Sequence, residues 1–428
     1  MKACNEYNTL SRRDVVGGAM KLGMIAALST PAWMPRMAFA QSQNSARDIL
    51  IQVFLRGGMD GLSLCPPHGD PLYYQRRPTI AVPQPGSGSP RAAVNLNGYF
   101  GLHPALQPLM PAYQAGQLLI VHATGAVANQ WTRSHFDAMR WMELGRPNDI
   151  TLYTGWIGRH LQSVPAGNGT APLRGMAIAD GLPVSLAGAP LTLPIPDPTS
   201  FKFADGWDNR LQLEAYLRAN YERAPGVLKS AALASQNTED MLDTVGFANY
   251  QPAGGAVYPD NDFGKALRAT AALVRAEVGL ETICIDRGDW DTHSGQGTTD
   301  GHLNELFTEI GQGLAAFHAD MNGANFTRYT VVVMSEFGRN VWENGSQGCD
   351  HGTGNAMLLM GPHVLGGRVF ANWPGLGLGQ LFEEQDLMPT TDYRDVAAEI
   401  VAKRLANTSA IGSIFPGYTP TFRGLVAA

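Results

Sequence analysis

An uninterrupted apolar run at Val331–Met334, three β-branched valines and a methionine, is the feature that most constrains the fold of this chain. A run of this kind predicts a strand buried on both faces, as in a sheet covered by helices on both sides. Polar residues begin at Ser335, and a glycine-rich loop then leads to the adjacent pair Asp350 and His351. In an open parallel sheet, ligands bind beyond the carboxyl ends of the strands, so this loop is a candidate functional site.

The same pattern, an apolar run followed by polar and glycine residues, recurs along the chain. We predict further strands over 48–55, 117–122, 175–178, 281–285 and 356–360, and helices over 105–113, 129–143, 303–317 and 392–405. Strands that alternate with helices predict an α/β fold, a sandwich with a mainly parallel central sheet flanked by helices. Helices predicted over 209–222, 226–245 and 262–278 have no strand between them, which suggests a helical cap inserted at 206–280.

Polar clusters follow four of these elements: Asp60, the run Thr132–His135, Asp291 with His293, and Asp350 with His351. Because the carboxyl ends of parallel strands meet at one edge of a sheet, we expect the clusters to lie together. Carboxylate oxygens and imidazole nitrogens are ligands for divalent metals, zinc among them. The sequence therefore predicts a metal site at this edge.

Thr132 and Ser134 stand where the helix over 129–143 needs an N-cap. Each hydroxyl has two interpretations, a simple cap or a nucleophile at a helix N-terminus, where the helix dipole favours an anionic substrate. Arg133 beside them suits a phosphate or sulfate oxygen. The sequence leaves both interpretations open.

The first 40 residues predict a secretion signal. Arg12 and Arg13 form a twin-arginine pattern, a short apolar stretch follows, and Ala38-Phe39-Ala40 is typical of a cleavage site. This favours export through the Tat translocon to the periplasm or beyond, and the stretch is too short to span a membrane as a mature helix. The net charge of −6 over 428 residues argues against a nucleic-acid partner.

At this point the chain resembles the DUF1501 family, within the alkaline-phosphatase-like superfamily, over nearly all of residues 41–428. The segments that carry the resemblance are 54–62, 101–106, 133–137, 290–293, 335–339, 350–352, 366–369, 373–376 and 391–394. The resemblance implies a three-layer sandwich. It also implies one or two divalent metals, with zinc first and manganese or calcium as alternatives, and a hydroxyl nucleophile at a helix N-terminus.

Residue by residue, the resemblance implies the metal ligands Asp60, Asp291, His293, Asp350 and His351, with Asp291 preferred to Asp289. Thr132 or Ser134 corresponds to the nucleophile, and Ser134 is preferred because its primary hydroxyl is less crowded. The superfamily usually has one more histidine near the C-terminus. Since only His363 follows His351, His135 or Glu336 could complete a second metal site.

Together these features predict an exported, metal-dependent hydrolase of phosphate esters or related anions, with Arg133 or Arg339 neutralising the substrate's charge. A non-catalytic protein that binds an envelope glycan or a partner is the alternative from another class. A sulfatase-like hydrolase is the third possibility. Cys65-Pro66-Pro67-His68-Gly69 comes nearest to the sulfatase signature but lacks its arginine.

Overall fold

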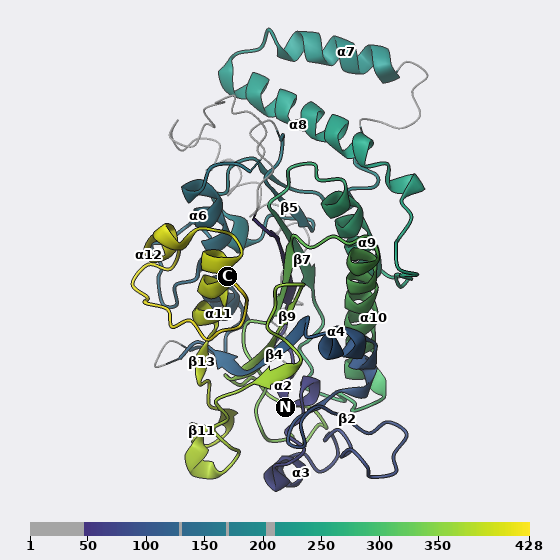
Figure 1. The fold of residues 1–428 in the computed structure, drawn as a ribbon. Coiled ribbons are helices and arrows are strands. Elements are labelled where there is room, and N and C mark those ends of the chain that lie inside the picture. Colours follow the sequence, from purple (N-terminus) through teal and green to yellow (C-terminus); the bar gives the residue numbers. More distant parts are fainter. Residues whose placement is uncertain (1–46, 128–130, 168–170, 203–209) are drawn as a thin grey trace. The chain divides into compact units, whose positions relative to one another are not determined.

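The computed structural model describes residues 47–127, 131–167, 171–202 and 210–428. Within these residues the largest element is a nine-stranded sheet (Figure 1). Its order is β10 (Arg368–Phe370), β4 (Leu118–Gly125), β9 (Asn355–Met360), β8 (Tyr329–Met334), β1 (Ile49–Leu55), β7 (Thr282–Arg287), β5 (Gly175–Ile178) and β6 (Thr192–Pro194). The ninth strand, β13 (Thr391–Asp392), pairs with the end of β4.

The sheet is parallel except at β9, which runs antiparallel to both of its neighbours, β4 and β8. The other strand pairs of this sheet are all parallel. The amino end of β9 therefore lies at the edge of the sheet where β8 and the other strands have their carboxyl ends. Its carboxyl end, with His363 beyond it, lies at the opposite edge.

Helices cover both faces of the sheet, because the central strands are apolar on both sides. In β1, Ile51 and Val53 enter one core, while Leu50 and Phe54 enter the other. The first core is closed by η2 (Pro104–Leu109), α4 (Met110–Gln114), α9 (Asp262–Arg275) and α10 (Gly301–Gly323). The second is closed by α5 (His135–Leu144), α6 (Trp156–Ser163), α11 (Tyr393–Lys403) and α12 (Ile411–Ile414). The predicted α/β architecture with three layers is confirmed.

The expected helical segment contains α7 (Arg210–Tyr221), α8 (Gly226–Val245) and α9. Of these, α9 is part of the layer that covers the sheet, and Met241 and Leu242 near the end of α8 reach the same core. The core packing of α9 excludes it from the expected cap, which leaves α7 and α8. Residues 206–209, where the cap was expected to start, lie outside the described part.

The remaining elements are short. They are α2 (Gly61–Leu64), α3 (Pro71–Arg76), β2 (Val94–Asn95), β3 (Gly101–Leu102), η3 (Val184–Leu186), η4 (Phe247–Asn249), η5 (Leu378–Gln380), β11 (Leu381–Phe382), β12 (Asp386–Leu387) and η6 (Thr408–Ala410). No helix within the described residues is both long and apolar enough to cross a membrane. The predicted signal, residues 1–40, lies outside the described residues.

Candidate metal centre

Two loops and one helix start meet at the edge of the sheet where the parallel strands end. The loop after β7 carries Asp291 and His293, the connection from β8 to β9 carries His351, and α5 begins at His135. Close approach of these loops depends on Gly57, which has a φ of 120°. A side chain there would place its Cβ 2.7 Å from the backbone nitrogen of Asp291, so glycine is required.

Each of the three imidazoles is fixed through its Nδ1 atom. His135 donates to Glu336 Oε1 at 2.7 Å, and His293 donates to Asp350 Oδ1 at 2.9 Å. His351 donates to the backbone carbonyl of Arg133 at 2.7 Å. Bonds of this kind set the ring orientation and leave the Nε2 lone pair for a metal, as is usual for histidine ligands.

The Nε2 atoms of the three imidazoles converge on Asp291. Asp291 Oδ1 lies 3.4 Å from His135 Nε2, 3.1 Å from His293 Nε2 and 3.2 Å from His351 Nε2. The Nε2 atoms of His293 and His351 are 2.8 Å apart. The ligand atoms of His135, Asp291 and His351 all lie within 4.8 Å of one another, and His293 Nε2 adjoins this group next to Asp291 and His351.

Arg339 holds the carboxylate of Asp291 in place. Its Nη2 atom donates to Asp291 Oδ1 at 2.7 Å and to the carbonyl of Trp290 at 2.8 Å, and it also bonds the carbonyl of Gly57. The Arg339 side chain is fully buried, with no face open to a substrate. In this position Arg339 contacts Asp291, and the anion-binding role expected from the sequence gains no support.

The charged side chains around Asp291 shift the pKa values of His135, His293 and Asp291. Burial alone would lower the pKa of His135, but the carboxylates of Asp291 and Glu336 raise it to about 9. Asp291 raises the pKa of His293 as well. The pKa of Asp291 falls well below its usual range, because the three histidines and Arg339 outweigh its desolvation. A metal ion would compete with protons for these atoms.

The residues present fit a divalent metal ion. One ligand atom each of His135, Asp291 and His351 lies within 4.8 Å of the other two. Ligands held tetrahedrally about 2.0–2.1 Å from zinc are roughly 3.3 Å apart, close to the distances between Asp291 and the imidazoles. The buried Nε2 atom of His135 makes no hydrogen bond, as expected of an atom reserved for a metal. Asp291 is exposed, so the site is open to solvent.

Asp60, expected as a ligand, lies outside this cluster in an ion pair. It is fully buried, and Arg77 bonds both of its oxygens, at 2.6 and 3.1 Å. Ser63 Oγ and Gln296 Nε2 also donate to Oδ2, at 2.6 and 2.9 Å. These four bonds tie the carboxylate to residues outside the histidine cluster. The expectation that Asp60 binds the metal thus gains no support, because a guanidinium already takes the cation's position.

Asp350 reaches the cluster only through another residue. Its Oδ1 accepts from His293 and, at 3.1 Å, from Asn344, and most of its side chain is exposed. It thus acts as the outer partner of a ligand. Asp289, the alternative to Asp291, forms a salt bridge with Arg287 at 2.8 Å. His363 lies beyond the carboxyl end of β9, at the other edge of the sheet.

Both candidate nucleophiles accept a backbone hydrogen bond at the start of α5. Ser134 is the N-cap and accepts from the backbone nitrogen of Asp137 at 3.5 Å, a long bond. Thr132 Oγ1 accepts from the backbone nitrogen of Ser134 at 3.1 Å. Arg133 between them forms salt bridges with Glu383 at 3.0 Å and Asp386 at 2.7 Å. Both salt bridges use its Nη2 atom, and its backbone carbonyl accepts from His351 Nδ1.

From the sequence, His135 and Glu336 are candidates for a second metal site, and the structure joins the two by a hydrogen bond next to Asp291. The available signal was the position of His135 in the first turn of α5, directly after the N-cap. Glu336 follows β8 in the same way that Asp291 follows β7. Both signals are local in the sequence, and they show only that each residue lies at this edge of the sheet. That His135 and Glu336 contact each other can be seen only in the folded structure.

Comparison with known proteins gives a family and two distant structural likenesses. The chain resembles the solved structure of Ps i-CgsB in complex with k-i-k-neocarrahexaose, at 8% identity and a TM-score of 0.34, covering 83% of this chain and 71% of that chain. It also resembles the phosphonate monoester hydrolase of Agrobacterium radiobacter, at 8% identity and a TM-score of 0.33, covering 88% and 79%. Scores this low do not bear on function.

No curated protein matches the chain. A family model does match, over residues 47–408, and its description is "Protein of unknown function (DUF1501)". The matched range includes the sheet and the metal-ligand cluster, the name given to the candidate ligands His135, Asp291, His293 and His351. The chain therefore belongs to the DUF1501 family.

Proposed function

We propose that this protein is a metal-dependent hydrolase of phosphate esters or related anions. The observation that supports the proposal is the convergence of three imidazole Nε2 atoms and one carboxylate oxygen, with each imidazole anchored through Nδ1. A nitrogen-rich ligand set favours zinc over calcium, which prefers oxygen ligands. A divalent ion bound here would stabilise charge on the ester oxygens and lower the pKa of water or a hydroxyl.

In this proposal the chain's own residues have distinct tasks. His135, His293, His351 and Asp291 hold the ion. Glu336, Asp350 and the carbonyl of Arg133 orient the three rings, and Arg339 orients Asp291. The N-terminus of α5 adds a favourable field for an anion, because its first N–H groups point toward the same edge.

We propose Ser134 as the nucleophile, since it immediately precedes His135 and caps α5. Its oxygen would form a bond to phosphorus while the bond from phosphorus to the leaving oxygen breaks. The hydroxyl proton ends on the leaving alcohol, and water then hydrolyses the phosphoserine. Thr132 is the competing nucleophile, and direct attack by water is the alternative to both.

Metal analysis combined with an activity assay tests the proposal. Protein purified without chelator should contain about one divalent ion per chain and hydrolyse a phosphate ester. Asp291→Asn and His351→Ala should lose both the metal and the activity, whereas His302→Ala, a histidine bonded to the carbonyl of Asp289, should keep both. Bound metal without hydrolysis of any phosphate or sulfate ester would favour a binding protein. Absence of metal from correctly folded protein would end the proposal.

We also propose that the protein is exported, which rests on the sequence of residues 1–40 alone. A precursor in which Arg12 and Arg13 are both changed to Lys should stay in the cytoplasm, because twin-arginine recognition needs the guanidinium pair. Cell fractionation and the size of the product report the result. Normal processing in a strain without the Tat translocon would contradict export by this route.

A further inference from the structure

The side chains around the candidate metal ligands carry more negative than positive charge. Three of them are carboxylates: Asp291 among the ligands, and Glu336 and Asp350, which accept from the Nδ1 atoms of two ligand histidines. One guanidinium, that of Arg339, contacts Asp291 at 2.7 Å. The formal charge of these four side chains is therefore −2, and a bound divalent ion would bring it to zero.

Arg133 also contacts this group, but it adds no positive charge to the site. Its backbone carbonyl accepts from His351 Nδ1, while its guanidinium forms salt bridges with Glu383 and Asp386, at 3.0 and 2.7 Å. One cation with two carboxylates leaves a further formal charge of −1 beside the metal-ligand cluster. Since 44% of the Glu383 side chain is exposed, part of this charge faces solvent.

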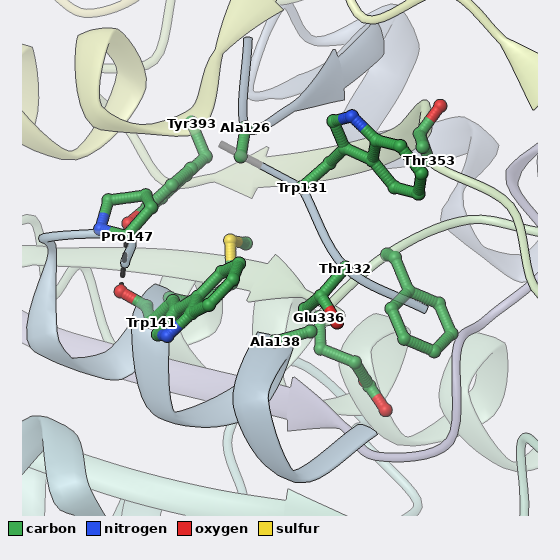
Figure 2. A pocket seen from close by; sticks show the side chains of 11 residues that line it. Ala126, Trp131, Thr132, Ala138, Trp141, Pro147, Glu336, Thr353 and Tyr393 are labelled. Atoms are coloured by element: carbon green, nitrogen blue, oxygen red, sulfur yellow. Dashed lines mark hydrogen bonds between the residues drawn. The ribbon is translucent and has the colours of Figure 1, made fainter. Parts of the chain in front are cut away.

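Two carboxylates of the site itself are open to solvent. The exposed fraction of the side chain is 32% for Asp291 and 63% for Asp350. Glu336 is buried, and it lines a pocket beside the start of α5 (Figure 2). That pocket holds about 20 Å³, room for roughly one water molecule, so it does not take up an organic group. We therefore expect a substrate to meet the cluster from the solvent side, next to Asp291 and Asp350.

A doubly charged ester would be poorly neutralised in these surroundings. A phosphate monoester carries close to two negative charges in neutral solution. A divalent ion is already balanced by the carboxylates around it, so both charges would be in excess, and like charges repel strongly where water is partly excluded. A singly charged ester adds one negative charge, and the N-terminus of α5, equivalent to roughly half a positive charge, offsets part of it.

We infer that the ester hydrolysed at this site carries a single negative charge, as phosphate diesters and sulfate monoesters do. The inference rests on the proposed function and narrows the substrate class of the same site. Phosphate monoesters in neutral or alkaline solution are excluded, because the exposed carboxylates of Asp350 and Glu383 repel their second charge.

Binding of two anions of nearly the same shape, neither of which contains an ester bond, tests the inference without turnover. Dimethylphosphinate carries one charge, and methylphosphonate carries two in mildly alkaline solution. Calorimetry on the metal-containing protein should show tighter binding of dimethylphosphinate, by about threefold or more. Glu383→Gln removes a nearby negative charge and should narrow this preference by improving the affinity for methylphosphonate. Asp240→Asn, an exposed carboxylate of α8 paired with Arg218, is the matched control and should keep the preference.

Hydrolysis of three chromogenic esters with one leaving group then separates the two singly charged classes. The highest kcat/KM for bis(para-nitrophenyl) phosphate would assign the site to phosphate diesters. The highest value for para-nitrophenyl sulfate would assign it to sulfate monoesters. The highest value for para-nitrophenyl phosphate would overturn the inference, because that ester carries the second charge.

The binding outcomes separate the inference from the function on which it rests. Equal or tighter binding of methylphosphonate would overturn the single-charge assignment while leaving the hydrolase proposal intact. A preference that Glu383→Gln leaves unchanged would show that the carboxylates do not select the charge, and would also overturn the inference. Failure of both anions to bind the metal-containing protein would count against the hydrolase proposal itself.

Discussion

The carboxylate of Glu336 determines the ring orientation in which His135 would bind a metal ion. It accepts from Nδ1, so the ring turns its Nε2 toward Asp291, and its negative charge increases the basicity of the imidazole. Both effects act through His135, because Glu336 itself is buried and saturated with hydrogen bonds. Glu336 is therefore a positioning residue.

Replacing Glu336 with Gln should weaken metal binding by about 10- to 100-fold, the usual cost of changing the partner of a metal-binding histidine. The shape of the side chain is kept, but the metal-free protein should lose some thermal stability at neutral pH, because the carboxylate that helps raise the pKa of His135 is gone. Competition with a fluorescent chelator measures the affinity. Glu383→Gln, which removes a carboxylate bound to Arg133, serves as the control. Equal affinities for the two variants would mean that Glu336 does not act on His135.

The buried carboxylate of Asp60 is a second group whose role follows from its hydrogen-bond partner, here the guanidinium of Arg77. Arg77 also donates to the carbonyls of Asn340 and Val341, at 2.9 and 3.1 Å, and so ties the connection between β8 and β9 to α2. Gln296 links Asp60 to Thr292 at 2.9 Å, between the two metal ligands of that loop. Through these hydrogen bonds the pair of Asp60 and Arg77 connects the loop after β7 to the connection between β8 and β9.

Asp60→Asn should lower the free energy of unfolding by about 3–5 kcal/mol, because it leaves the Arg77 charge buried without a counter-charge. Urea denaturation measures this, and the folded fraction should still bind metal. Changing both residues, Asp60→Leu with Arg77→Met, should recover much of the stability, since neither charge then remains. Loss of metal with little change in stability would instead identify Asp60 as a ligand.

At the level of elements, the reversed strand β9 brings the two halves of the site together. Since β9 runs antiparallel to β8, the connection between them begins and ends at the same edge of the sheet. Glu336 lies at its start and His351 near its end, and both face His135 on α5. A parallel β9 would have required a crossover to the opposite edge.

Both hydroxyls lie just before α5, with Ser134 as its N-cap, so replacing each residue in turn separates a capping role from a role as nucleophile. Ser134→Ala should reduce kcat on a phosphate ester by several orders of magnitude with unchanged metal content, as expected for a lost nucleophile. Thr132→Ala should leave kcat nearly unchanged. Removing a cap alone should cost about 1 kcal/mol of stability. Full activity in both variants would show that water attacks the substrate, and the reverse pattern would identify Thr132.

Across the whole molecule, burial keeps several histidines neutral. Burial lowers the pKa of His103 and His122 to about 4 and that of His160 to about 3, and the charge of Asp60 offsets only part of the effect for the first two. His122 donates from Nε2 to the carbonyl of Cys65 and accepts at Nδ1 from the nitrogen of Ala123. Protonation would break the second of these bonds.

Stability of the metal-free protein should therefore fall as the pH drops from about 6.5 to about 4. The folded-state pKa is lower than the unfolded value of about 6.5, so the unfolded chain binds more protons in this range. His122 alone would contribute roughly 3 kcal/mol, since a tenfold change in proton affinity is worth about 1.4 kcal/mol. Urea titrations after chelation, between pH 7 and 4.5, measure the slope, and ring NMR of His122 should show a neutral imidazole at pH 5. A flat profile would contradict the prediction.

The sequence alone was sufficient for the fold class and for the edge of the sheet that carries the chemistry. An apolar run such as Val331–Met334 predicts a strand buried on both faces, and the polar residues that follow predict where the strand ends. Both predictions need only residues that are neighbours in the chain, so the sequence suffices for them. The same reasoning located Asp291, His293 and His351. It could not determine the partner of each polar group, since such contacts join distant segments.

Only the tertiary structure decided those partners. His135 meets Glu336 across 201 positions, and Asp60, which the pattern made a ligand as plausible as Asp291, meets Arg77 in place of the histidines. A buried carboxylate must be neutralised by whatever cation the fold brings to it, a metal or a guanidinium. Which cation neutralises the carboxylate depends on how segments that are distant in the sequence pack together. The local sequence does not contain this information.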